Sequence, residues 1–116
     1  MDKKDLEERT KKFALRVIRL VQALPKSKAS DVIGYQLLKS GTSIGANYRE
    51  AVRAVSKADF ICKVGIVEKE TNETLYWLEL LEESKIMGSE KLSDLKDECE
   101  QLLKIFTSTG KSAKRK

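Results

Sequence analysis

Apolar residues recur at alternating steps of three and four positions along most of this 116-residue chain, and that spacing is the strongest constraint on its fold. Such a spacing places apolar side chains on one face of an α-helix, whereas a half-buried strand needs strict alternation. Alternating runs rich in Val, Ile and Thr are absent. The pattern therefore predicts a chain of amphipathic helices, each of which needs a partner to cover its apolar face.

The first two helices are separated by the only proline. We expect the first helix to run from about Asp2 to Leu24, because Pro25 cannot continue it. The second begins near Ser30, and its apolar register continues to Val55 through the polar segment 40–43, so we expect one continuous helix. The positions expected in the core are Leu6, Phe13, Val17, Leu20, Val21 and Leu24, then Ile33, Leu37, Gly41, Ile44, Tyr48, Ala51 and Val55.

The last two helices have recognisable start and stop signals. Ser56 followed by Asp59 resembles a capping box that opens the third helix. Gly88 is expected to end it, Ser89 to cap the fourth helix, and Gly110 to end that one. The expected core positions are Phe60, Val64, Val67, Thr71, Thr74, Leu78 and Leu81, then Leu92, Leu95, Cys99, Leu102 and Phe106.

Four amphipathic helices joined by short connections fold most simply as an antiparallel up-down-up-down bundle, which places this chain in the all-α class. A chain of this length has room for one modest core, so we expect a single domain. We expect the bundle to occupy residues 1–110 and residues 111–116 to form a disordered basic tail.

Three glycines lie inside the expected second helix, although each costs about 1 kcal/mol relative to alanine there. Gly34, Gly41 and Gly45 fall within roughly 40° of one another around the helix axis. We interpret them as the place where a neighbouring backbone approaches closely. A phosphate-binding loop is the alternative, but no strand precedes the segment and no Lys-Ser/Thr pair follows it.

The third helix has apolar residues on a second face, opposite its core positions. A face that mixes aromatic, apolar and charged residues is typical of a subunit interface, although scattered surface apolar residues are also common. The candidate interface residues are Cys62, Ile66, Tyr76, Trp77 and Leu80.

Basic residues form two rows that could neutralise a phosphate backbone. Residues 1–28 contain nine basic and four acidic side chains, a net charge of +5, whereas residues 58–86 contain three and seven, a net charge of −4. The alternative is a solvated face with internal salt bridges. The candidate nucleic-acid-binding residues are Arg9, Lys12, Arg16 and Arg19 on the first helix, and Arg49 and Arg53 on the second.

Catalysis, metals and cofactors are not expected. The chain has no histidine, which removes the commonest general base and every Ser-His or Cys-His arrangement. The acids of Glu70-Thr71-Asn72-Glu73 lack the histidine ligand of di-iron bundles. Two isolated cysteines, no membrane-length apolar stretch and no signal peptide at the amphipathic N-terminus predict a cytoplasmic protein.

Two segments carry a family resemblance that extends over nearly the whole chain. One is Ser40-Gly-Thr-Ser-Ile-Gly-Ala-Asn-Tyr-Arg-Glu-Ala51; the other comprises Asp59-Phe-Ile61, Lys69-Glu70 and Glu73-Thr-Leu-Tyr-Trp-Leu78. Together they resemble the four-helix-bundle family encoded in intervening sequences of bacterial 23S rRNA genes, once labelled ribosomal proteins. The resemblance implies a homopentamer and kinship with the basic, pentameric accessory protein of diversity-generating retroelements. It implies no catalytic residues.

The function expected from these features is nucleic-acid binding, most simply RNA binding, by a homo-oligomer that does not read sequence. The alternative is an interaction scaffold that docks a partner protein on the assembled bundle. Salt dependence separates the two, because phosphate contacts release counterions and therefore weaken steeply with ionic strength.

Overall fold

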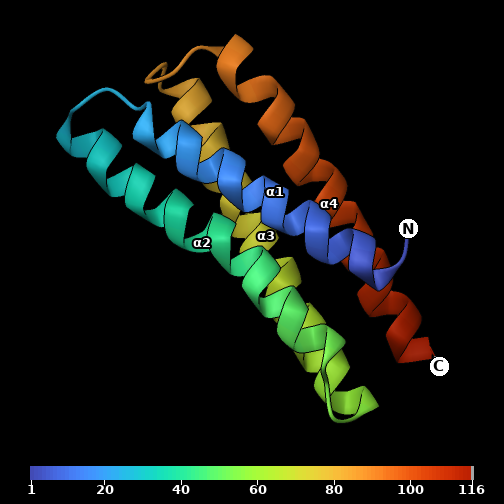
Figure 1. Cartoon of the computed structure of the whole chain (residues 1–116). Helices are drawn as coiled ribbons and strands as arrows, with labels where there is room; N and C mark the ends of the chain where they lie inside the picture. Colours follow the sequence, from blue (N-terminus) through green and yellow to red (C-terminus); the bar gives the residue numbers. More distant parts are fainter. Residues whose placement is uncertain (116) are drawn as a thin grey trace.

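The computed structural model describes residues 1–115, which form four antiparallel helices in an up-down-up-down bundle (Figure 1). The helices are α1 (Lys3–Gln22), α2 (Lys28–Val52), α3 (Lys57–Glu83) and α4 (Ser89–Arg115). The bundle measures 46 × 20 × 19 Å, and both chain termini lie at the same end of it. The predicted fold class is confirmed, and α2 continues through residues 40–43 without a break.

Short polar side chains begin the first three helices. The Asp2 carboxylate accepts a hydrogen bond from the Asp5 N–H at 2.8 Å, and the Asp5 carboxylate accepts one from the Asp2 N–H at 3.1 Å. The Ser56 hydroxyl accepts from the Asp59 N–H at 3.0 Å, as predicted. The Asp59 carboxylate, however, accepts from the Val55 N–H, so only half of the expected capping box forms.

The structure corrects three predicted helix ends. Val55 lies beyond α2 and is 92% exposed, because the chain already turns at Arg53 to reach the cap of α3. Gly88 does not end α3: Lys85 is the residue with positive φ, at 62°. The turn comes earlier because Met87, directly before Gly88, is buried in the core. Ser89 is the first residue of α4 rather than its cap.

The predicted disordered tail is wrong for residues 111–115, because α4 continues past Gly110 to Arg115. A single helical glycine costs only about 1 kcal/mol, which tertiary contact can offset. Gly110 still faces α3, where an added Cβ would lie 3.8 Å from Val64 and 3.9 Å from Glu68. Lys116 lies outside the described residues.

The core runs along the bundle axis and contains most of the predicted positions. Several buried hydroxyl groups hydrogen-bond inside the bundle: the Thr74 hydroxyl donates to Ser40 at 2.9 Å and the Thr10 hydroxyl to the Leu6 carbonyl at 2.8 Å. The buried Ser30 hydroxyl has no hydrogen-bond partner among the described residues. Phe60 was expected in the core but is only half-buried. Within the described part of the chain, no helix is long and apolar enough to cross a membrane.

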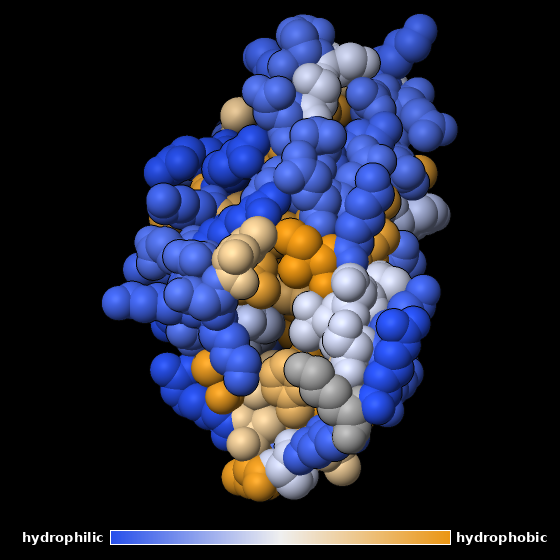
Figure 2. Space-filling model, turned by 90° about the vertical axis from the view of Figure 1, so that its right-hand side faces the viewer, coloured by the Kyte–Doolittle hydropathy of each residue, from blue (hydrophilic) through white to orange (hydrophobic). Residues whose placement is uncertain are grey.

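The helices pack in chain order, and this leaves one side of the bundle open. α1 packs on α2, α2 on α3, and α3 on α4, whereas α1 and α4 approach each other at only a few points. The strip between α1 and α4 is therefore covered less completely than the other three helix contacts. Figure 2 shows an apolar strip in a hollow along one side of the molecule, with hydrophilic residues on both flanks.

Candidate nucleic-acid and subunit interfaces

The three glycines of α2 all face α1. A Cβ added at Gly41 would lie 2.9 and 3.0 Å from the two methyl groups of Val17. At Gly45 it would lie 3.2 Å from the Thr10 hydroxyl, and at Gly34 3.1 Å from a Leu24 methyl group. The small residues allow α1 and α2 to pack more closely than side chains at these positions would permit.

Arg9 of α1 forms an ion pair with Glu98 of α4. Its guanidinium donates to both carboxylate oxygens of Glu98, at 2.7 and 2.8 Å, and to Gln101 at 3.0 Å. Both side chains are largely covered, with 25% of Arg9 and 17% of Glu98 exposed. Hydrogen bonding to Glu98 raises the pKa of Arg9 above its usual value, although burial opposes the rise. Arg9 therefore ties α1 to α4 where the two helices are otherwise apart.

The other candidate cations lie in different places. Arg53 donates to the Glu7 carboxylate and to the Arg49 carbonyl, both at 3.0 Å. Lys12, Arg16 and Arg19 share the Arg9 side of α1, and among residues 1–115 none of them makes an ion pair. The structure thus does not unite the six predicted residues. It leaves one row of three on α1, with Arg49 separate on α2.

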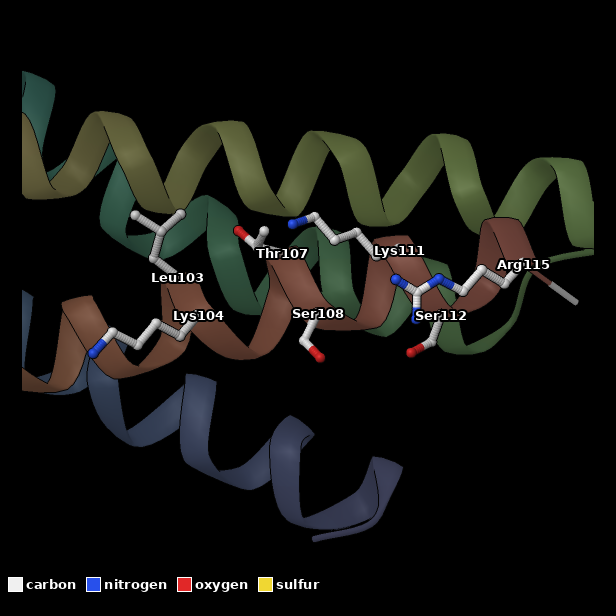
Figure 3. A pocket seen from close by; sticks show the side chains of 7 residues that line it. All are labelled: Leu103, Lys104, Thr107, Ser108, Lys111, Ser112 and Arg115. Atoms are coloured by element: carbon white, nitrogen blue, oxygen red, sulfur yellow. The ribbon is translucent and has the colours of Figure 1, made fainter.

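A second basic surface was missed at the sequence level. Because residues 111–115 are helical, Lys104, Lys111 and Arg115 form a row on α4 with Ser108 and Ser112 between them (Figure 3). These five residues, with Leu103 and Thr107, line a shallow groove on the bundle surface. In the sequence, this surface could have been predicted from the absence of any Asp or Glu after Glu100.

The other side of this row borders a groove made by three helices. It is lined by Lys3 of α1, by Lys57 and Phe60 of α3, and by residues of α4. The Lys3 ammonium lies over the Phe60 ring, 5.4 Å from its centroid. Phe60 is half-buried because α1 and α4 do not close over it. The α4 residues of this groove are Ser108, Thr109, Ser112 and Ala113.

The predicted second face of α3 lies on the surface of this single chain. Ile66 is 41% exposed and Tyr76 53% exposed, Cys62 is exposed, and Trp77 and Leu80 are half-buried. The rings of Tyr76 and Trp77 meet edge to face, with centroids 5.0 Å apart. The indole N–H donates to Glu73 at 3.1 Å.

A further exposed apolar pair on α2 had not been singled out in the sequence. Val32 and Tyr35 are 55% and 63% exposed. They are one helical turn apart, so both lie on the same side of α2. Two separate apolar patches, one on α3 and one on α2, are therefore present on the surface of one chain.

Of the two thiols, that of Cys99 is buried in the core and that of Cys62 is exposed. Burial raises the pKa of the Cys99 thiol to about 12, and the thiol donates to the Thr71 carbonyl at 3.4 Å. A thiol with such a pKa is a poor nucleophile at neutral pH. No group of three or more metal-ligating side chains occurs in residues 1–115.

The fold and its surfaces define a small all-α bundle with basic and apolar faces. The chain belongs to the family described as 23S rRNA-intervening sequence proteins, whose profile matches residues 3–108. It is similar in structure to a protein of unknown function from the S23 ribosomal protein family of Bacteroides thetaiotaomicron VPI-5482. That comparison gives a TM-score of 0.87 and 39% identity, over 96% of this chain and 99% of the other. A search of the curated proteins found no match.

Proposed function

We propose that this protein is a non-catalytic homo-oligomer, a pentamer, that binds RNA through phosphate contacts. The observation that carries the RNA proposal is the row of cations on α1. Lys12, Arg16 and Arg19 lie within roughly 60° of one another and have no ion-pair partner among residues 1–115. Cations without ion-pair partners on one side of a helix can contact successive phosphates of a nucleic-acid strand.

The structure narrows the set of proposed RNA-binding residues. Arg9 and Arg53 already bond to Glu98 and Glu7, so a phosphate would have to displace a carboxylate to reach them. We therefore assign RNA contact to Lys12, Arg16, Arg19 and Arg49, and a structural role to Arg9 and Arg53. Contacts from these cations to phosphates carry no sequence information, which fits binding without sequence readout.

The second face of α3 supports the oligomer. Ile66, Tyr76 and Trp77 place aromatic and aliphatic surface beside Lys69 and Glu73, and aromatic side chains are enriched at protein interfaces. A single four-helix bundle has no further helix to cover this face. A second copy of the chain covers it in the proposed assembly, and each copy brings its own row of α1 cations to the particle.

The test measures RNA affinity against ionic strength. We expect log K to fall linearly with log salt, and Arg16→Gln/Arg19→Gln to make the slope shallower by about 1.4 for single-stranded RNA, since each phosphate contact contributes about 0.7. The matched control is Lys26→Gln/Lys28→Gln, which removes two exposed cations at the α1–α2 turn and should leave the slope unchanged.

The scaffold alternative predicts a different result from the same material. If purified protein binds no RNA at low salt but co-purifies with a defined protein whose binding is insensitive to salt, RNA binding is wrong. If the Arg16/Arg19 and Lys26/Lys28 variants lose the same amount of RNA affinity, the α1 row is not the RNA-binding surface.

A further inference from the structure

We propose that the C-terminal half of α4, with the first turns of α1 and α3, forms a groove for single-stranded nucleic acid. This inference rests on the proposed nucleic-acid binding and assigns it a second site. The phosphates of the strand lie along α4, and one base stacks on Phe60.

The charge distribution of α4 supplies the first argument. Residues 89–100 contain five acidic and two basic side chains, whereas residues 101–115 contain four basic ones and no acid. Lys104, Lys111 and Arg115 lie within roughly 40° of one another and extend over about 16 Å of helix axis. None of the three makes an ion pair within the described chain. About three turns of one helix therefore carry a row of cations without ion-pair partners in the described chain (Figure 3).

Serine residues alternate with the cations of this row along α4. Ser108 and Ser112 lie between the cations, and both are exposed. Ser108 and Ser112 line the α4 groove and also the neighbouring groove that contains Phe60. Hydroxyl donors beside lysine and arginine are the usual partners of phosphate and sugar oxygens. A strand that follows the row thus remains next to the aromatic ring along part of its length.

Phe60 supplies the second, independent argument. A phenylalanine in the register of the core would normally be covered, yet this ring is half-buried in a groove bounded by Lys3 and Lys57. The Lys3 ammonium already lies over the ring face, which shows that the face is open to a group outside the core. A nucleobase can occupy that place, and the flexible lysine can then contact the adjacent phosphate. Aromatic side chains in a basic groove are the common platform for single strands.

The ring also explains why a single strand fits better than a duplex. Paired bases remain stacked inside a duplex and cannot reach a side chain recessed between helices, whereas unpaired bases can. Anionic lipid headgroups would use the same cations but need no base platform. The contribution of Phe60 therefore distinguishes the single strand from both alternatives.

The experiment compares three variants by fluorescence anisotropy with a labelled oligouridylate, a duplex of equal length and anionic phospholipid vesicles. Lys104→Gln/Lys111→Gln/Arg115→Gln removes the row and should make the salt slope for the single strand shallower by about 2, at about 0.7 per contact. Lys26→Gln/Lys28→Gln/Lys85→Gln removes equal charge at the opposite end of the bundle and should leave the slope as it was. Phe60→Leu should weaken single-strand binding roughly tenfold and leave duplex binding unchanged.

Each outcome has a definite reading, provided thermal unfolding shows that Phe60→Leu is folded. If the unmodified protein binds no nucleic acid, the proposed function fails and this site fails with it. If it binds, and the α4 variant matches its control, the groove is wrong while RNA binding through α1 stands. The proposal is also wrong if Phe60→Leu weakens the binding of single strand and duplex equally. It is wrong as well if the α4 variant loses vesicle binding but keeps its binding of nucleic acid.

Discussion

At the scale of single residues, the glycines show how the same residue type serves two different surroundings. Gly41 lies under both methyl groups of Val17, and the Val17 Cβ is itself 3.3 Å from the place of an added Cβ. Gly65 lies on α3, where an added Cβ would meet nothing within 4 Å. Val17 is fully buried and branched at Cβ, so it cannot rotate its way out of a clash. Close packing explains Gly41 but not Gly65.

We therefore predict opposite effects of alanine at these two positions. Gly65→Ala should raise the free energy of unfolding by up to about 1 kcal/mol, since only helix propensity changes. Gly41→Ala gains the same propensity but overpacks against Val17 at a cost of about 1–3 kcal/mol, for a net loss of up to about 2 kcal/mol. Chemical denaturation of both variants measures the difference. Equal stabilisation by the two substitutions would rule out close packing at Gly41.

At the scale of helices, the weakest contact in the bundle is also the one with the strongest polar link. α1 and α4 approach each other at few points, yet Arg9 donates to both Glu98 oxygens across that gap. The pair is bidentate and mostly covered by protein, so it is worth more than an exposed pair. We therefore expect Arg9 to stabilise the packing of α4 against α1 rather than to bind a ligand.

A double-mutant cycle tests that role. Arg9→Gln and Glu98→Gln should each lower the free energy of unfolding, and their coupling energy should be about 1 kcal/mol, near the upper end for ion pairs of this kind. Arg9→Gln should leave RNA affinity within about twofold, in contrast to Arg16→Gln. If Arg9→Gln weakens RNA binding as strongly as Arg16→Gln while the coupling energy is near zero, Arg9 is a ligand contact instead.

The helices also show what sequence patterns can and cannot predict. The apolar period located four helices and the buried side of each, because burial depends on spacing within each helix. It missed the end of α4 and the turn at Lys85, because the burial of residues such as Met87 depends on tertiary packing that local spacing does not encode. The apolar period also could not show that Arg9 has an ion-pair partner whereas Arg16 has none among the described residues. The partner of Arg9 lies 89 positions away on another helix, beyond any local pattern.

At the scale of the whole molecule, the two exposed apolar patches bear on the proposed assembly. A closed ring of five copies needs a heterologous interface, in which one surface of each copy meets a different surface of the next. The α3 face around Trp77 is one such surface, and the α2 pair Val32 and Tyr35 is the other apolar patch found on this chain. A standard interface covers about 800 Å² of each partner, a small share of the 7077 Å² that one chain exposes.

We therefore predict that damage to either patch dissociates the assembly. Light scattering of the unmodified protein should give about five times the 13.1 kDa of one chain. Trp77→Glu and Tyr35→Glu should each give single chains, because a charge is costly in a desolvated contact. Val55→Glu, at an exposed turn, is the control that should remain assembled.

Mixing the two dissociated variants tests the ring geometry itself. In a heterologous ring, Tyr35→Glu keeps an intact α3 face and Trp77→Glu keeps an intact α2 patch, so one sound contact can form between them. Their mixture should give particles of twice the single-chain mass and nothing larger, because the remaining surfaces are both damaged. The exposed Cys62 thiol of the Tyr35→Glu partner should then react more slowly with a thiol reagent, while the buried Cys99 stays unreactive throughout. Single chains in the mixture, or an unmodified protein that is itself a single chain, would contradict an interface between these two patches.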